Sequence, residues 1–280
     1  MNIEELLVKF MKKAGEIALS YQDKIMEYDS HCKEETAASV VTEADVKISN
    51  LFKAFLKEEL DHDDYVIIDE ETLSSLGDDK YAKAKSKTYQ FVIDPIDGTL
   101  PYSLGMPSYG TVVGIMKNMK PYMGAVYAPS LGELVVYGGD KVKRYKNPFT
   151  DKQKITELEE KDNNPVLIFP KPSSVQVDSF MFNKKKEVVV DFYAAAVHCI
   201  YLALGIAKGY YYSVWIWDVC GAWPILNKLG YKFYNIETGK ELTEFGPENF
   251  SDGFKIKDFH VICKEKDYPR LKELARCRKK

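Results

Sequence analysis

The chain has 280 residues, of which 45% are hydrophobic and 29% charged, and its formal net charge is -3. A chain of this size and composition can bury a sizeable core, and its balanced charges do not favour a nucleic acid polymer or an anionic membrane as partner. No stretch reads as a signal peptide or a membrane span. The five cysteines are scattered without a CxxC pair, so we expect a reduced, cytoplasmic protein.

The first half of the chain reads as helices laid on an antiparallel sheet. Apolar residues at helical spacing predict one helix over residues 3 to 28. A second helix is predicted to begin near Thr42, where Thr42 and Asp45 form a T-x-x-D capping pattern. The polar stretch over residues 72 to 87 is predicted to be exposed. Five β-prone runs are predicted as strands, at residues 65 to 68, 89 to 93, 109 to 116, 123 to 128 and 133 to 137.

The second half reads as a separate α/β unit. The predicted elements are, in order, a strand at residues 166 to 169, a helix at 193 to 208, a strand-like run at 210 to 217 and a helix at 218 to 229. We therefore divide the chain into an N-terminal α+β part, residues 1–147, and a C-terminal α/β part, residues 148–280.

Acidic side chains follow three of the apolar runs, at the points where the backbone is expected to turn. They are Asp69, Glu70 and Glu71 after the first run, Asp94 and Asp97 after the second, and Asp218 after the run that ends at Trp217. Buried carboxylates that converge repel one another and lose hydration, so they need cations. Ligands that are all oxygen atoms select magnesium, manganese or calcium over zinc. The pattern therefore predicts a site for hard divalent cations.

The hexapeptide DPIDGT at residues 94–99 adds a phosphate-binding turn to this site. Pro95 stiffens the turn, Gly98 allows a ligand to approach the backbone closely, and a helix that begins at Gly98 and Thr99 would aim N–H groups at a phosphate. No arrangement of Ser, Cys or His indicates a covalent nucleophile. The residues favour in-line attack on phosphorus by a metal-activated water, the chemistry of a magnesium-dependent phosphomonoesterase.

Ordinary structural roles are open for the same residues. Asp-Gly pairs usually mark turns, and an acidic doublet such as Glu70 and Glu71 is common on a solvated surface. The three tryptophans, Trp215, Trp217 and Trp223, are by default core aromatics. Spacing alone leaves the metal site and the plain turn as equal alternatives.

Four segments together resemble the inositol monophosphatase superfamily and occur in the order typical of that family. They are VTEAD at residues 41–45, DEE at 69–71, IDPIDGT at 93–99 and WDVCGA at 217–222. The resemblance runs through most of the chain and implies a layered αβαβα sandwich. It also implies magnesium activation by two or three Mg²⁺ ions, sensitivity to lithium, and a homodimer.

The resemblance assigns roles to individual residues. It implies that Glu70 and Thr99 orient the attacking water, that Asp45 hydrogen-bonds to Thr99, and that the amides of Gly98 and Thr99 hold the phosphate. The implied metal ligands are Glu70, Asp94, the carbonyl of Ile96, Asp97 and Asp218.

The substrate pocket departs from the pattern of the inositol-specific members. Those members place a glutamate several residues before the WD motif, whereas this chain has Tyr210, Tyr211, Tyr212 and Ser213 there, and the family's Gly-Ser or Gly-Thr step is replaced by the segment 194–196, which is AAA. The tyrosines could stack on a base or a sugar, or belong to the core. The predicted substrate-binding residues are Gly98, Thr99, Ala195, Ala196, Tyr211 and Asp218.

These features predict the hydrolysis of a small phosphorylated metabolite, first of all an inositol or sugar phosphate monoester. A 3′(2′),5′-bisphosphate nucleotidase is the alternative within the same enzyme class, because it shares the metal ligands and differs in the leaving-group pocket. A catalytically idle relative that serves as a binding or scaffold protein is the alternative from a different class. That alternative predicts a missing ligand, whereas every metal position of the motif is filled here.

Overall fold

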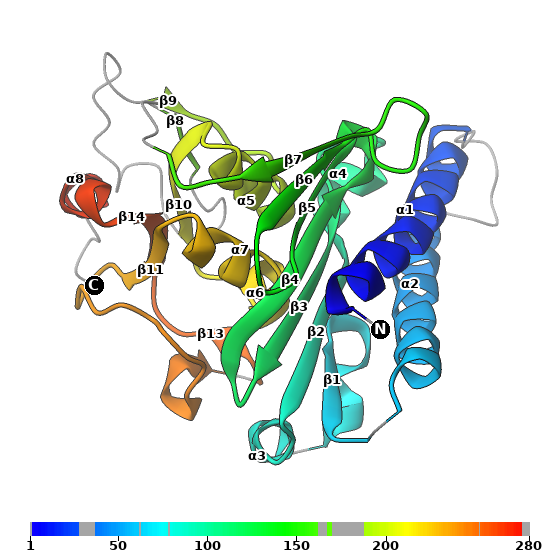
Figure 1. Ribbon diagram of the computed structural model, residues 1–280, viewed down its shortest axis with the longest axis horizontal. Helices are drawn as coiled ribbons and strands as arrows, with labels where there is room; N and C mark the ends of the chain where they lie inside the picture. The colour runs from blue at the N-terminus through cyan, green and yellow to red at the C-terminus, as the bar shows by residue number, and fades with distance from the viewer. Residues whose placement is uncertain are drawn as a thin grey trace.

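A computed structural model shows helices and sheets stacked in five alternating layers (Figure 1). Two long helices form one outer layer, a large sheet follows, a group of shorter helices lies in the middle, and a smaller sheet and a last helix complete the stack. The predicted αβαβα sandwich is confirmed. The structure describes residues 2–27, 37–61, 63–77, 79–161, 167–169, 188–251 and 253–275.

The first layer consists of α1 (Ile3–Glu27) and α2 (Ala37–Glu59), which pack through apolar stripes at helical spacing. The rings of Phe10 and Phe52, one from each helix, have centroids 4.8 Å apart. The predicted helix at residues 3 to 28 is confirmed, apart from residue 28, which lies outside the described residues. The predicted start near Thr42 is wrong, because α2 already includes Ala37 and Thr42 lies inside the helix. Packing of the apolar stripe extends the helix past a local capping pattern.

The second layer is a seven-stranded sheet in the order β1 to β7, with β1 parallel to β2 and every other neighbouring pair antiparallel. Five of its strands match the predicted runs, and β6 and β7 were not predicted because they are mostly polar. The predicted division at residue 147 falls between β6 and β7 of this one sheet. The strands are β1 (Tyr65–Asp69), β2 (Tyr89–Asp97), β3 (Gly110–Lys117), β4 (Lys120–Ala128), β5 (Glu133–Tyr137), β6 (Val142–Lys146) and β7 (Lys154–Leu158).

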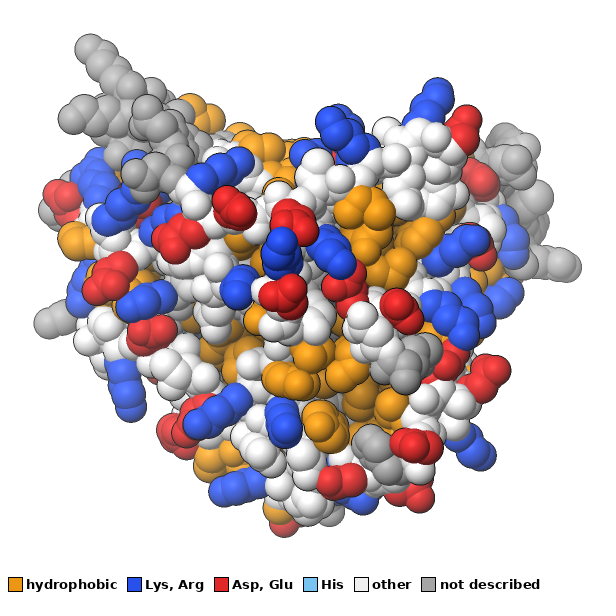
Figure 2. Space-filling view, viewed as in Figure 1, with side chains coloured by type: hydrophobic (Ala, Val, Ile, Leu, Met, Phe, Trp, Pro, Cys, Tyr) orange, Lys and Arg blue, Asp and Glu red, His pale blue; other side chains and the backbone are white. Residues whose placement is uncertain are grey.

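Short helical turns connect these strands. The stretch predicted to be polar and exposed contains η1 (Glu70–Leu76) and α3 (Lys80–Lys85), while α4 (Thr99–Ser103) and η2 (Pro129–Leu131) follow β2 and β4. Basic and acidic side chains are interspersed on the visible face, with hydrophobic side chains exposed between them (Figure 2).

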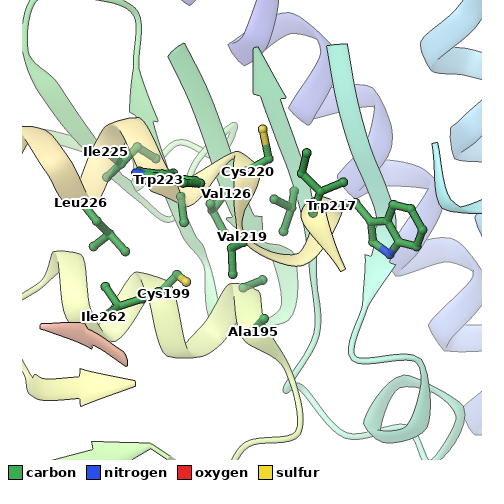
Figure 3. Close-up of a cluster of buried hydrophobic side chains, with 14 of the residues drawn as sticks. Val126, Ala195, Cys199, Trp217, Val219, Cys220, Trp223, Ile225, Leu226 and Ile262 are labelled. Atoms are coloured by element: carbon green, nitrogen blue, oxygen red, sulfur yellow. The ribbon is translucent and has the colours of Figure 1, made fainter. Parts of the chain in front are cut away.

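The middle layer contains α5 (Ala195–Ala203), α6 (Ile216–Cys220) and α7 (Ala222–Lys228). Side chains of these helices meet strand β4 in one buried cluster (Figure 3). The predicted helix at 218 to 229 is in fact two helices joined at Gly221. A Cβ added to Gly124 of β4 would lie 2.2 Å from the Gly221 carbonyl oxygen, so only glycine there lets this joint lie directly on the sheet.

The fourth layer is a five-stranded sheet in the order β11-β14-β10-β8-β9, and α8 (Tyr268–Leu274) packs on its outer face. The predicted strand-like run at 210 to 217 is only partly confirmed, because the central strand β10 ends at Tyr212 and α6 begins at Ile216. The predicted strand at 166 to 169 is β8, apart from residue 166, which lies outside the described residues. The strands are β8 (Leu167–Phe169), β9 (Val188–Val189), β10 (Ala207–Tyr212), β11 (Tyr231–Asn235) and β14 (His260–Lys264). The remaining elements are β12 (Phe250–Ser251), β13 (Lys255–Ile256), η4 (Pro247–Asn249) and η5 (Glu265–Asp267).

Three cysteines, Cys199, Cys220 and Cys263, are buried free thiols, whereas Cys32 and Cys277 lie outside the described residues. Trp217 and Trp223 are buried, as predicted, whereas Trp215 is only half-buried. Among the helices of the described ranges, none has both the length and the apolar character needed to cross a bilayer.

Candidate active site

A β-bulge at the end of β2 arranges the first two carboxylates of the site. In a regular strand Asp94 and Asp97, three residues apart, would point to opposite faces. The pairing with β3 shifts between Asp94 and Asp97, which face Val112 and Gly110, so β2 holds one extra residue here. Inside the bulge the Thr111 hydroxyl donates to the Pro95 carbonyl at 2.8 Å. The extra residue turns both carboxylates toward the middle helix layer.

The middle helices bring the third carboxylate to this place. Oxygen atoms of Asp94, Asp97 and Asp218 all lie within 4.8 Å of one another. Asp218 belongs to α6, and its Oδ2 accepts the backbone N–H of Trp215 at 2.6 Å. Asp97 Oδ2 accepts the backbone N–H of Ala196, in the first turn of α5, at 2.6 Å. The cluster therefore depends on both helices docking against the first sheet.

Glu70 joins the cluster from the neighbouring strand. β1 runs parallel to β2 with Asp69 opposite Ile93, so the residues that follow, Glu70 and Asp94, emerge at the same edge of the sheet. The two carboxylates interact, because the charge of Glu70 helps to raise the pKa of Asp94. Burial, and then the negative charge of Asp218, raise the pKa of Glu70 to about 7.

Burial and mutual repulsion raise the pKa values of the carboxylates in the cluster, and a positive charge would relieve this repulsion. Burial, followed by the charge of Glu70, raises the pKa of Asp94 well above its ordinary value, and burial raises that of Asp97 to about 7. One oxygen of Asp94, Oδ1, is buried and has no hydrogen-bond partner among the described residues. A buried carboxylate oxygen without a partner is costly, and a divalent cation would supply the partner. The all-oxygen donor set fits a hard cation such as Mg²⁺.

Asp45 and Thr99 meet at the backbone of Ile96. Asp45 lies inside α2 and is buried, and it accepts the backbone N–H of Ile96. Burial, and next the charge of Glu71, raise the pKa of Asp45 to about 8. The Thr99 hydroxyl donates to the Ile96 carbonyl at 3.3 Å. Both side chains therefore support the turn, and the direct hydrogen bond between them stays a prediction.

Position 98 requires glycine, because segments from the two halves of the chain approach its backbone too closely for a side chain. Gly98 adopts a left-handed conformation (φ 85°, ψ 42°) at the start of α4. A Cβ at this position would lie 2.8 Å from the Ala194 Cβ and 2.9 Å from the Ser108 carbonyl oxygen. The turn predicted to approach a ligand is thus also the point where β2 meets the loop before α5.

The structure places some of the predicted substrate residues beside the acidic cluster and Tyr211 away from it. Ala195 and Ala196 lie beside the cluster, and their backbone N–H groups hydrogen-bond to Asp97. Tyr211 is not placed at the site, because its side chain is buried on the outer face of the second sheet, where its hydroxyl donates to the Leu271 carbonyl at 2.6 Å. Alternation along β10 turns Tyr210 to the inner face instead.

Sequence reasoning missed two residues here. Tyr210 is buried on the inner face. Its pKa is raised first by burial, then by the charge of Cys199, and then by the charges of Asp218 and Asp97. The two-residue period of a strand could have separated Tyr210 from Tyr211. Thr111, which holds the bulge, carried no signal beyond being a polar residue in an apolar strand.

The sequence matches the inositol monophosphatase family over residues 2–278. The chain belongs to this family. This inositol monophosphatase family member is 24% identical to inositol monophosphatase 1 of Saccharomyces cerevisiae over 258 residues, which cover 85% of this chain and 84% of that protein. It is 26% identical to protein qutG of Emericella nidulans over 129 residues, which cover 44% of this chain and only 36% of that protein.

The fold of this family member is shared with solved structures. The crystal structure of inositol monophosphatase II from Staphylococcus aureus MSSA476 matches it with a TM-score of 0.71, over 99% of this chain and 94% of that chain, at 16% identity. The predicted family resemblance is confirmed. The family is metal-dependent and acts on small phosphorylated substrates, which fits the acidic cluster.

Proposed function

We propose that this protein is a magnesium-dependent phosphomonoesterase that releases phosphate from a small metabolite, first of all an inositol or sugar phosphate. The observation that carries the proposal is the cluster of Asp94, Asp97 and Asp218 with one buried, unpartnered carboxylate oxygen. Structural carboxylates are normally satisfied by the protein itself. A carboxylate left unsatisfied among other acids supports a site completed by a cation.

The chain offers a full set of ligands for two or three Mg²⁺ ions. When bound, these ions would supply positive charge to the phosphoryl oxygens and lower the pKa of a water. The residues that would hold them are Glu70, Asp94, the carbonyl of Ile96, Asp97 and Asp218.

The remaining residues position the reactants. Glu70 and the exposed Thr99 hydroxyl would orient the attacking water. Asp45 would stabilise the turn by accepting the backbone N–H of Ile96. The backbone amides of Gly98 and Thr99 would bind the phosphate. The start of α5, where Ala195 and Ala196 contact Asp97, would lie beside the leaving group.

A bisphosphate nucleotidase is the second candidate, and the leaving-group side favours it. The described residues next to Gly98 and Asp97 on that side are Ala194, Ala195 and Ala196, whose methyl side chains cannot hydrogen-bond to the hydroxyls of a polyol. A hydroxyl left without a partner on binding lowers affinity. The two candidates differ only in this pocket.

The experiment is to measure phosphate release from inositol 1-phosphate, fructose 1,6-bisphosphate and adenosine 3′,5′-bisphosphate, with Mg²⁺ and again with EDTA. Metal-dependent release from any of the three supports the proposal and ranks the substrates. The control is Asp140→Asn, which changes an exposed aspartate outside the cluster and should leave the rates unchanged. Folded protein with Mg²⁺ that is silent on all three would favour a non-catalytic binding role.

We also propose, from family membership, a cytoplasmic homodimer that lithium inhibits. Light scattering would give the mass in solution, and titration with LiCl during turnover would test inhibition. A monomeric mass, or full activity at high LiCl, would contradict the respective part of the proposal.

A further inference from the structure

Tyr193 presents an exposed aromatic ring directly before α5. Its side chain is 56% exposed, although aromatic residues tend to be buried. Its backbone has a φ of 56°, in the left-handed region that bulky residues rarely adopt. Such conformations persist only where the surrounding structure enforces them, and they concentrate at functional sites.

The loop that carries Tyr193 is held from several sides. The Phe192 N–H donates to Nε2 of the buried His198 at 3.0 Å, and the Ser108 hydroxyl donates to the Phe192 carbonyl at 2.6 Å. The Tyr193 N–H donates to Asp191 Oδ1 at 2.7 Å. Both backbone groups of Phe192 are therefore bound to side chains from different elements, so the ring of Tyr193 projects from a supported backbone.

This loop borders the proposed site. The residue after Tyr193 is Ala194, whose Cβ lies 2.8 Å from the Cβ that any side chain at Gly98 would have. Two residues further, Ala196 hydrogen-bonds to the metal-ligand candidate Asp97. Tyr193 is thus adjacent to the segment that touches both the predicted phosphate turn and the acidic cluster.

We propose that Tyr193 is a specificity-determining residue that stacks on the leaving group and favours a flat one, such as a nucleoside, over a polyol. The inference rests on the proposed phosphomonoesterase function and deepens it: of the two candidate substrate classes it selects the nucleotide, not the inositol or sugar phosphate placed first above. An exposed ring at the position before Ala194 gains contact with a planar aromatic face, whereas its single hydroxyl offers few partners to the hydroxyls of a polyol. A supported backbone lowers the entropic cost of that contact.

The test compares wild type, Tyr193→Phe and Tyr193→Gly in the full chain with Mg²⁺. Glycine accepts a positive φ and removes the ring without adding strain, and phenylalanine keeps the ring, so it is the matched control. For adenosine 3′,5′-bisphosphate we expect Tyr193→Gly to raise KM about tenfold and Tyr193→Phe to change it less than about twofold, since stacking on a base is worth about one decade or more in affinity. For inositol 1-phosphate both variants should match wild type, and wild type should prefer the nucleotide.

The outcomes separate the inference from the function on which it rests. Metal-dependent release with equal effects of Tyr193→Gly on both substrates, or with no effect on either, would overturn the role of Tyr193 and leave the phosphatase intact. Absence of release from every substrate would count against the proposed function. In that case calorimetric titration with the nucleotide decides on Tyr193: about tenfold weaker binding in Tyr193→Gly supports it, and absence of binding to wild type overturns it.

Discussion

Two buried aspartates at the ends of neighbouring parallel strands have opposite surroundings. Asp69 ends β1 and is 1% exposed, and Asp94 lies near the end of β2 and is 2% exposed. The protein satisfies Asp69 completely, with a lysine ammonium group, two hydroxyls and a backbone amide. These partners are Lys53 at 3.0 Å, the hydroxyl of Ser49, the hydroxyl of Thr72 at 2.9 Å and the N–H of Glu71 at 3.1 Å.

Asp94 receives no comparable support from the described residues. Its Oδ1 has no partner, and its nearest charged neighbours are the acids Glu70, Asp97 and Asp218. The two positions have the same residue type and nearly the same depth, so burial alone does not distinguish them. The difference is whether the chain itself supplies the cation. Asp69 is satisfied within the fold, and Asp94 is the carboxylate that the proposed ion would satisfy.

The largest expected effect comes from removing the charge that the chain leaves unsatisfied. Asp94→Asn should reduce kcat on the order of a thousandfold, because a ligand shared with the metal is lost. Its melting temperature in EDTA should equal or exceed that of wild type, since the substitution removes a repelled carboxylate. Steady-state kinetics and thermal unfolding measure the two quantities. A stable variant with wild-type kcat would refute the role of Asp94.

The reverse result is expected at the satisfied carboxylate. Asp69→Asn should lower the free energy of unfolding by about 2–4 kcal/mol, because it breaks a buried ion pair and leaves its partners unpaired. The kcat of the folded protein should change much less than in Asp94→Asn. Urea unfolding followed by circular dichroism gives the stability. An unchanged stability would show that the Asp69 network is not structural.

Stability of the metal-free protein should fall as pH rises, opposite to the usual behaviour of paired carboxylates. Burial raises the pKa of Asp45 from 3.8 to about 8 and that of Glu70 from 4.5 to about 7. At a pH between the unfolded and the folded pKa, the folded state keeps protons that the unfolded state has lost. The contribution of these groups to the free energy of unfolding is therefore fully present below the unfolded pKa and is lost as pH rises through the folded pKa. Each retained proton contributes about 1.4 kcal/mol per pH unit.

Thermal unfolding in EDTA between pH 5 and pH 8 would measure this slope. Saturating Mg²⁺ should make it shallower, because a cation stabilises the ionised carboxylates most where they are fully ionised. Asp94→Asn should also reduce it. A metal-free stability that increases over this range would contradict the assigned surroundings of these groups.

The smallest effect concerns the bulge that separates the two kinds of carboxylate. Thr111→Val keeps the shape of the side chain and removes the hydrogen bond to Pro95, so the free energy of unfolding should fall by about 1 kcal/mol. If the bulge positions Asp94 and Asp97, KM for Mg²⁺ should rise as well. A half-buried control, Thr156→Val on β7, should change neither quantity.

The sequence alone determined which acidic residues form the cluster. The acids after the apolar runs and the DPIDGT turn indicated a cation site, and Asp94, Asp97 and Asp218 do converge, although they are far apart in the chain. These residues could be predicted because each is marked by a short local pattern in the sequence, an apolar run followed by acids and then a turn. The helix over residues 3 to 28 and most of the first sheet could be predicted for the same reason, because the periodicity of their apolar residues is visible in a short stretch of sequence.

Only the tertiary structure decided which of the buried groups are satisfied. Nothing local distinguishes Asp69 from Asp94, because the lysine and hydroxyls that satisfy Asp69 come mostly from α2. Nor does the run of tyrosines reveal that Tyr211 faces α8, because register within the second sheet sets its direction. Hydrogen bonds and charges act over a few ångströms in space, and segments distant in the sequence reach that range only in the folded chain.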